Sequence, residues 1–333
     1  MTDEKPKTRR WRIRTVLYLF LLLVIAGGLA WLFGPREPVD LTVRFDPAVI
    51  GDDIDAYLAA NEAKIADMRP DSDKQIVWAY PASHAKTPFA LVDLHGFSAA
   101  RQEIRPVPDM VAADLGANLF FTRLKGHGRT GDAMTEATVN DWIQDAAEAV
   151  AIGERIGEKV VIVGVSTGAT LGVLAATLPE MKDRVAGIVL ISPNFRINAA
   201  TAPILTFPFA RTIVPLVAGG QRSFEPHNEA HARNWTWSYP TVALLPMAAM
   251  VKRTASLPFE DIGIPALFIY HPDDSVVDES VAAEVAGRWG GPVTTRVLTK
   301  TGDPSNHVVA GDIISPETNA QVAGAIAEFV RGL

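Results

Sequence analysis

Short apolar runs alternate with amphipathic stretches along most of the chain. After residue 75 the apolar runs are rich in Val, Ile and Leu, as in strands that are buried on both faces of a sheet. The stretches between them repeat apolar residues at helical spacing. We predict strands at residues 75–80, 89–94, 117–121, 160–165, 187–191, 266–270 and 293–298, and helices at 102–115, 139–156, 169–178, 276–289 and 317–329. The pattern predicts an α/β protein with a mostly parallel central sheet and helices on both faces.

Weaker patterns precede this core. Residues 41–45 alternate like an edge strand, and residues 53–68 place apolar side chains near helical spacing. We therefore expect residues 34–74 to form a linker and an N-terminal extension. The main domain is expected to cover residues 75–333.

One interval interrupts the alternation of strands and helices. Residues of about 194–260 are rich in proline and aromatic side chains, and a structureless loop of this length would be improbable. We expect a small, mainly helical cap inserted between two strands. Its aromatic residues, Phe207 and Phe209 among them, are expected to wall an acyl-binding pocket. The alternative is that the cap packs on something else, such as a membrane surface.

The longest apolar run lies near the N-terminus. Residues 16–33 carry no charge and would span roughly 27 Å as a helix, enough for the core of a bilayer. Basic residues crowd the segment before it. This predicts a basic cytoplasmic tail at 1–15, a transmembrane signal-anchor helix at 16–33 and an extracytoplasmic body. The alternative is a signal peptide cleaved near residues 28–30, which would release a secreted protein.

Charge and composition narrow the class of function. The formal net charge is −7, but residues 1–36 hold seven basic and two acidic residues, so the remainder sums to −7 − 5 = −12. A body this acidic repels phosphate backbones, so we expect no nucleic-acid partner. The chain has no cysteine, which excludes disulfides, thiolate metal sites and cysteine nucleophiles. No pattern indicates a protein partner.

The most specific motif is Gly-Val-Ser-Thr-Gly at residues 164–168. An apolar strand-like run precedes it and a helical stretch follows, which is the context that a nucleophile elbow requires. Glycines flank the serine because the strained turn leaves little room for Cβ atoms. The helix N-terminus would favour a developing oxyanion. Ser166 is therefore the candidate nucleophile, and the alternative is an ordinary strand-to-helix turn with a capping serine.

A serine nucleophile needs a histidine base that is held by a carboxylate. In a fold with this elbow the chain order is Ser, then Asp or Glu, then His. His307 follows the last predicted strand and is the candidate base. Asp274 and Asp273 both follow the strand at 266–270. We prefer Asp274, because the apolar pair after it would anchor the start of the next helix while its carboxylate points to the strand ends.

The oxyanion hole requires two backbone N–H donors. One is predicted at Thr167, directly after the nucleophile, and the other at Phe97, in the loop after the strand at 89–94. Two other histidines near these loops, His95 and His127, are expected to be structural.

Cofactor sites are not indicated. His227 and His231 are spaced like metal ligands on a helix, but no third ligand is predicted for them. The chain has no G-x-G-x-x-G after its first strand and no Walker loop. We therefore expect neither a metal ion nor another cofactor.

With these motifs assembled, the chain resembles the α/β-hydrolase superfamily, in its carboxylesterase and monoacylglycerol-lipase-like branch. The resemblance covers about residues 75–333. It rests on Leu-His-Gly-Phe at 94–97, Lys-Gly-His-Gly at 125–128, the Ser166 motif, Asp-Ser-Val-Val at 274–277 and Asn-His-Val at 306–308. In that order it implies the oxyanion loop, a structural turn, the nucleophile, the acid and the base. A proline often precedes the glycine of that turn, and the anchor is not a general feature of the branch.

The resemblance implies the α/β-hydrolase fold and hydrolysis of esters through an acyl-enzyme, without a cofactor. The expected substrates are small-molecule esters of small or medium acyl groups, or lipids. A thioesterase or an acyltransferase would use the same triad and differ in its pocket. The other class of function is a non-catalytic, membrane-tethered binding protein of the same fold.

Overall fold

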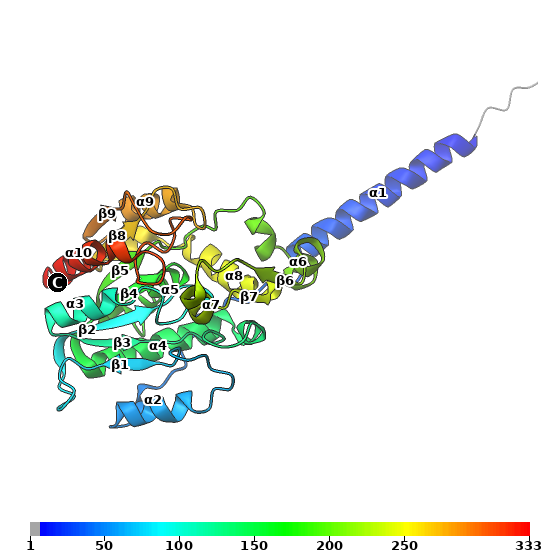
Figure 1. Cartoon of the computed structure of the whole chain (residues 1–333). Coiled ribbons are helices and arrows are strands. Elements are labelled where there is room, and N and C mark those ends of the chain that lie inside the picture. Colours follow the sequence, from blue (N-terminus) through cyan, green and yellow to red (C-terminus); the bar gives the residue numbers. More distant parts are fainter. Residues whose placement is uncertain (1–6) are drawn as a thin grey trace, which may run out of the picture.

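The computed structural model describes residues 7–333, which are built around a seven-stranded sheet (Figure 1). The strand order is β1-β3-β2-β4-β5-β8-β9. β1 pairs antiparallel with β3, and the other pairs in this sheet are parallel. The prediction of a mostly parallel central sheet is confirmed. The strands are β1 (Gln75–Val77), β2 (Thr87–Leu94), β3 (Asn118–Phe121), β4 (Gly157–Val165), β5 (Val185–Ile191), β8 (Ala266–Tyr270) and β9 (Val293–Val297).

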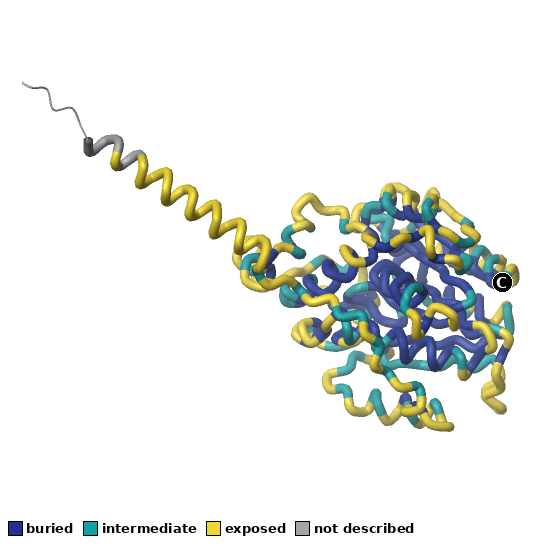
Figure 2. The backbone as a smooth tube through the Cα atoms, turned by 180° about the vertical axis from the view of Figure 1, so that it is seen from behind, coloured by how far each residue is buried: buried dark blue, intermediate teal, exposed yellow. Residues whose placement is uncertain are grey.

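Successive residues of the strands are buried on opposite faces of the sheet. In β4, Val160 and Ile162 pack in the same cluster as α4, α5 and α9, whereas Val161 and Val163 pack with α3 and α10. Both faces are therefore covered by helices, as the near-continuous apolar strands predicted. Figure 2 shows the resulting buried core. The covering helices are α3 (Val107–Leu115), α4 (Val139–Ile156), α5 (Thr167–Ala175), α9 (Glu279–Arg288) and α10 (Asn319–Arg331).

The segment between β5 and β8 forms the predicted insertion, which we call the cap. Three of its elements are α-helices, and β6 pairs antiparallel with β7 in a separate two-stranded sheet. The helix α8 packs on α5, which joins the cap to the core. The elements of the cap are η4 (Ala202–Thr206), α6 (Ala210–Ala218), β6 (Gln221–Ser223), α7 (Glu229–Asn234), β7 (Ser238–Pro240), η5 (Thr241–Ala243), α8 (Leu244–Thr254) and η6 (Phe259–Asp261).

The helix α1 (Lys7–Phe33) projects away from the body and leaves it beside α6 (Figure 1). Its segment Arg14–Phe33 is long and apolar enough to cross a membrane, and none of that segment is buried in the protein. Part of the predicted basic tail at residues 1–15 lies outside the described residues.

Several sequence-based predictions of local structure need correction. The strand predicted at 75–80 ends at Val77, and the helix predicted at 102–115 begins only at Val107. Residues 41–45 are not a strand, because the side chain of Gln144 accepts the N–H groups of Arg44 and Phe45 at 2.7 and 2.8 Å. The helix predicted at 53–68 is the shorter α2 (Ile54–Glu62). The helix predicted from residue 276 begins only at Glu279, because the backbone before it folds around Asp274 instead.

Candidate active site

Ser166 lies at the sharp turn between β4 and α5. Its φ of 51° falls in the left-handed region that a non-glycine residue rarely adopts. Its N–H donates to the carbonyl of Ile191 at 2.8 Å, which ties the turn to β5. A Cβ on Gly168 would lie 1.9 Å from the carbonyl oxygen of Leu94, so only glycine fits there. Sequence and structure agree on a strained turn that presents one serine hydroxyl at the N-terminus of a helix.

Three loops at the ends of β4, β8 and β9 bring Ser166, His307 and Asp274 into one chain of hydrogen bonds. The Ser166 Oγ lies 3.0 Å from His307 Nε2, and His307 Nδ1 lies 2.6 Å from Asp274 Oδ2. Asp274 is buried, whereas the neighbouring Asp273 is exposed. The structure therefore brings together Asp274, and not Asp273, with the two other predicted residues.

The carboxylate of Asp274 is oriented by its own backbone. Its Oδ1 accepts the N–H groups of Val276 and Val277 at 2.7 and 3.0 Å, which leaves Oδ2 for His307. The segment that enters the cap supports the same loop, because the side-chain amide of Asn198 donates to the carbonyl of Asp274 at 3.1 Å. The Val-Val pair thus acts through its amide groups, and only Val277 is also buried, because Val276 is 43% exposed.

The loop that carries His307 is organised by Asp303, a residue that belongs to none of the sequence motifs. Its Oδ2 accepts the N–H groups of His307 and Val308 at 3.1 and 2.8 Å. Directly after β5, the hydroxyl of Ser192 donates to the carbonyl of His307 at 2.8 Å. Burial disfavours the charged imidazole, but the hydrogen bond and charge of Asp274 outweigh it and raise the pKa of His307 above its ordinary value.

The predicted oxyanion donors are Thr167, directly after Ser166, and Phe97, in the loop that follows β2. Neither the N–H of Thr167 nor that of Phe97 has a hydrogen-bond partner within residues 7–333. The loop of Phe97 is tied to the cap, because the N–H of Thr236 donates to the carbonyl of Ser98 at 2.7 Å. The ring of Phe97 also packs edge-to-face on Tyr239, with ring centroids 5.5 Å apart.

His95 and His127 are buried in the protein rather than directed at Ser166. His95 Nε2 accepts the N–H of Leu124 at 3.1 Å, and its Nδ1 lies 2.9 Å from the carbonyl of Gly96. Burial lowers the pKa of His95 to about 4 and that of His127 to about 3. Both rings are therefore neutral. His95 joins its loop to Leu124 by a hydrogen bond, and the ring of His127 packs edge-to-face on Phe97 with ring centroids 5.5 Å apart.

A buried carboxyl group beneath the Phe97 loop had no signal in the sequence. Glu103 Oε2 accepts the N–H of Gly96 at 2.6 Å, and a Cβ on Gly96 would lie 2.6 Å from Glu103 Oε1. Burial raises the pKa of Glu103 to about 7, although the Gly96 N–H and the charge of His307 oppose that rise. Its carboxylate positions the residue before the predicted oxyanion donor.

A second buried carboxyl group lies next to Asp274. Glu279 opens α9, and its buried carboxyl group faces the carboxylate of Asp274. Burial, followed by the charge of Asp274, raises the pKa of Glu279 to about 9, so this side chain is neutral at pH 7. A glutamate in the first turn of a helix is usually an exposed partner of the helix dipole, and for that reason the sequence pattern could not reveal it.

The two phenylalanines that were expected to wall an acyl pocket lie elsewhere. Phe207 packs edge-to-face on Trp31 of α1 with ring centroids 4.9 Å apart, and Phe207 and Phe209 are 37% and 41% exposed. Two other aromatic residues of the cap lie by the site instead. Tyr239 packs on Phe97, and Trp235 clusters with Val308 beside His307.

The histidine pair of the cap is used within the protein. His231 Nδ1 accepts the N–H of His227 at 3.1 Å, and His227 Nε2 lies 3.6 Å from Asp303 Oδ1. Within residues 7–333, no group of three or more histidine and carboxylate side chains is arranged to hold a metal ion.

This chain is similar to one protein family in sequence and to several solved structures in fold. Residues 91–312 match the model of a family described as the alpha/beta hydrolase family. No curated protein matches the chain. A solved structure from work on LipS and LipT, two metagenome-derived lipolytic enzymes, is 20% identical, covers 79% of this chain and 99% of its own, and has a TM-score of 0.65.

Two further solved structures have similar folds. A soluble variant of monoglyceride lipase from Saccharomyces cerevisiae, in complex with a substrate analog, has a TM-score of 0.61 at 10% identity, covering 78% of this chain and 91% of its own. The monoacylglycerol lipase of Paleococcus ferrophilus has a TM-score of 0.54 at 15% identity, covering 78% and 98%. At such identities the likeness shows a shared fold.

Proposed function

This chain belongs to the alpha/beta hydrolase family, and on that premise we propose that it is a serine hydrolase that cleaves carboxylic esters. The observation that carries the proposal is the continuous hydrogen-bonded chain from Ser166 through His307 to Asp274. A hydroxyl, an imidazole and a buried carboxylate in this order are the groups that acyl transfer requires. The lipolytic and monoacylglycerol-cleaving enzymes with similar folds favour the same class of chemistry.

In the first half of the reaction, Ser166 Oγ attacks the ester carbonyl carbon while His307 Nε2 takes the hydroxyl proton. The carbonyl electron pair moves onto oxygen, and the N–H groups of Phe97 and Thr167 stabilise that oxyanion. Asp274 holds the imidazole in the required tautomer and stabilises its positive charge. When the intermediate collapses, the bond to the alcohol oxygen breaks and the alcohol leaves with the proton from His307.

In the second half, a water molecule attacks the acyl-enzyme. His307 takes a proton from that water, the same two N–H groups hold the second oxyanion, and the bond to Ser166 Oγ breaks. The acid product leaves and the serine recovers its proton from His307. The raised pKa of His307 suits both steps, because a more basic imidazole accepts these protons more readily.

We also propose that α1 anchors the enzyme in a membrane, with the N-terminus in the cytoplasm and the body outside it. The apolar segment Arg14–Phe33 and the basic residues that precede it support this orientation. The full chain should then resist carbonate extraction from membranes, and a reporter fused after Leu333 should read as extracytoplasmic. Soluble protein that begins near Trp31 would show a cleaved signal instead.

A fluorophosphonate probe tests the hydrolase proposal directly. The full chain in detergent should form a covalent adduct at Ser166, and Ser166→Ala should form none while it keeps its thermal unfolding transition. A panel of carboxylic esters and matched thioesters then identifies the acyl bond that is cleaved. A folded protein that neither reacts with the probe nor cleaves any member of the panel would contradict the proposal and favour a binding protein.

A further inference from the structure

Four large apolar side chains of the cap face outward beside α1. Phe207 and Phe209 precede α6, and Leu216 and Val217 lie in its last turn. Leu216 is 79% exposed and Val217 is 64% exposed, and both phenylalanines are exposed as well. We call these four residues the outer cap surface. Neither the core nor the proposed chemistry explains why apolar residues gather there.

The segment that follows α1 is docked on this surface. The Trp31 ring meets the Phe207 ring edge-to-face, and the N–H of Phe209 donates to the carbonyl of Pro35 at 2.7 Å. Gly34 lies so close that a Cβ there would be 2.5 Å from the ring of Phe209. The end of α1 and the outer cap surface are therefore in direct contact.

An ion pair fastens the same connection. The guanidinium of Arg211, in the first turn of α6, donates two hydrogen bonds to the carboxylate of Glu37 at 2.9 and 2.6 Å. The side chain of Glu37 is only 3% exposed, so the carboxylate of this ion pair is largely shielded from water. A guanidinium that donates two hydrogen bonds to one carboxylate fixes the relative orientation of the two side chains. The segment after α1 is thus held against α6 and does not act as a loose tether.

The charge of the cap differs from that of the rest of the body. Residues 194–260 hold six basic and three acidic residues, a net charge of +3, whereas residues 37–333 as a whole sum to −12. The body outside the cap therefore carries −12 − 3 = −15. A basic region beside an apolar surface matches a bilayer with anionic headgroups, which attracts the first and buries the second.

We propose that the outer cap surface inserts into the interface of the same membrane that α1 spans. This inference rests on the proposed membrane anchor. Since Trp31 is in contact with Phe207, the leaflet that surrounds the end of α1 also meets Phe209, Leu216 and Val217. Figure 1 shows α6 where α1 leaves the body. The cap then holds the site at the membrane, and the substrates that it favours are lipid esters that enter from the bilayer.

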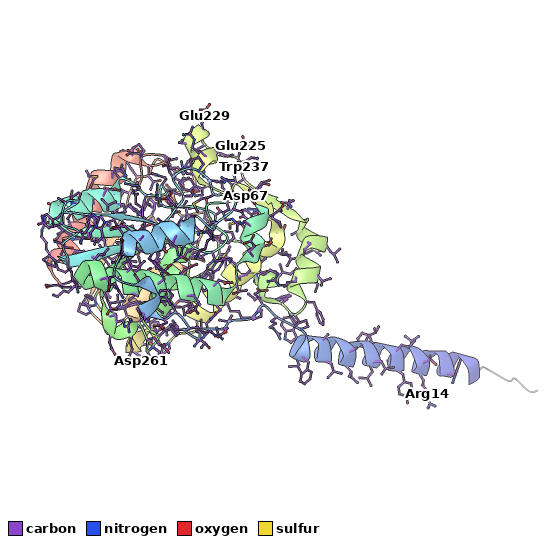
Figure 3. All side chains as sticks on the ribbon, turned by 90° about the horizontal axis from the view of Figure 1, so that it is seen from below. Arg14, Asp67, Glu225, Glu229, Trp237 and Asp261 are labelled. Carbon is purple, nitrogen blue, oxygen red and sulfur yellow. The ribbon has the colours of Figure 1, made fainter. Side chains whose placement is uncertain are left out.

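Single introduced cysteines can measure this insertion, because the chain has no cysteine of its own. The full chain is reconstituted into vesicles of phosphatidylcholine with a minority of phosphatidylglycerol. A polarity-sensitive fluorophore is attached at Leu216→Cys, at Leu22→Cys within α1, or at Asp261→Cys, an exposed position far from α1 (Figure 3). Lipids that carry a quencher should reduce the fluorescence at Leu22 and Leu216 several-fold more than at Asp261.

The three probes separate the possible failures. Quenching at Leu22 with none at Leu216 would overturn insertion of the cap and leave the anchor in place. Absence of quenching at Leu22 would overturn the anchor and this inference together. Neither result bears on ester hydrolysis, which is measured separately in detergent.

A paired variant tests the consequence for catalysis. The double change Leu216→Ser and Val217→Ser should reduce hydrolysis of a long-chain monoacylglycerol in these vesicles on the order of tenfold, because both side chains lose their apolar contact with lipid. Hydrolysis of a water-soluble short-chain ester should stay unchanged. Val49→Ser is the matched control, since Val49 is an exposed valine of η1 (Pro47–Ile50), outside the cap. Equal rates on vesicles before and after the double change, or an equal loss on both substrates, would overturn the inference.

Discussion

The cap has two apolar sides that differ in what covers them. On the inner side, Trp235 and Tyr239 are buried and pack on the loops of His307 and Phe97. On the outer side, Phe207 and Leu216 are exposed beside the end of α1. The two sides use the same kinds of side chain within one insertion. The two sides differ in their contacts and not in their composition: one packs on the loops of the candidate site, and the other faces outward.

This difference assigns separate tasks to the two sides. A change on the inner side acts on the groups around the reacting ester, so it should alter any substrate, soluble or membrane-bound. A change on the outer side should alter only how the enzyme meets a membrane. Rates of hydrolysis of soluble esters should therefore distinguish variants of the inner side from variants of the outer side.

The largest loss of activity is expected for variants of Ser166 and His307, which lie near the inner side of the cap. Ser166→Ala and His307→Ala should each lower kcat on a short p-nitrophenyl ester on the order of 10⁴-fold or more, because nucleophile and base act as a unit. Outer-surface variants should keep the rate of the parent on this substrate. Steady-state kinetics in detergent measures both, with thermal unfolding as the check on folding. If Ser166→Ala kept a tenth of the activity, the assignment of the nucleophile would be wrong.

The kcat values of variants at the two neighbouring aspartates should differ by nearly as much. Asp274→Asn should reduce kcat on the order of 10⁴-fold, because the amide would hold the imidazole in the wrong tautomer. Asp273→Asn should change it by less than about twofold, since Asp273 is exposed and contacts the site only through its backbone. Comparable kcat values for the two variants would remove the acid role from Asp274.

A smaller effect tests the inner side itself. Each methylene of an acyl chain buried there should raise kcat/KM up to about fourfold until the pocket is full. Medium acyl chains should therefore be preferred over acetate. Tyr239→Leu should shift the chain-length optimum on soluble esters, whereas Phe207→Leu should leave it in place. A flat profile in the parent, or an equal shift in both variants, would show that the inner side does not bind the acyl chain.

Much of the fold and the candidate site could be predicted because backbone constraints leave marks in the sequence. Valine-rich strands, the glycines around Ser166 and the order of Ser166, Asp274 and His307 reflect the turns and strand ends that the fold requires. The structure brings these three side chains within hydrogen-bond distance, and their catalytic roles stay a prediction.

Other features depend on partners far away in the chain and left no such mark. Residues 41–45 alternate like a strand, but Gln144 takes their N–H groups. Phe207 has the composition of a pocket wall, but Trp31 of α1 is its neighbour. Glu103 and Glu279 belong to segments that are usually solvated, and only the packing of loops over them shows that they are buried.

The last prediction concerns Glu279, next to Asp274 below the inner side of the cap, and it should affect stability more than activity. Its pKa is about 9 in the folded protein and lies near the ordinary glutamate pKa of 4.5 in the unfolded chain. The folded state thus holds a proton that the unfolded state releases. The stability from this group is fully present below about pH 4.5 and is lost as the pH rises toward 9. Glu279→Gln removes this loss because the amide stays neutral, so at pH 8 the variant should be more stable than the parent, on the order of 4 to 5 kcal/mol.

Thermal unfolding in detergent at pH 5 and pH 8 measures that difference. The advantage of Glu279→Gln should grow between the two values, while kcat at pH 7 changes by less than about twofold, since the parent carboxyl is already neutral there. Glu229→Gln is the matched control, because Glu229 is exposed on α7 and points away from the body in Figure 3. The same advantage at both pH values would mean that Glu279 is already ionised in the folded protein at pH 5. In that case the carboxyl group beside Asp274 would reach water, and the inner side of the cap would not exclude solvent from the acid of the site.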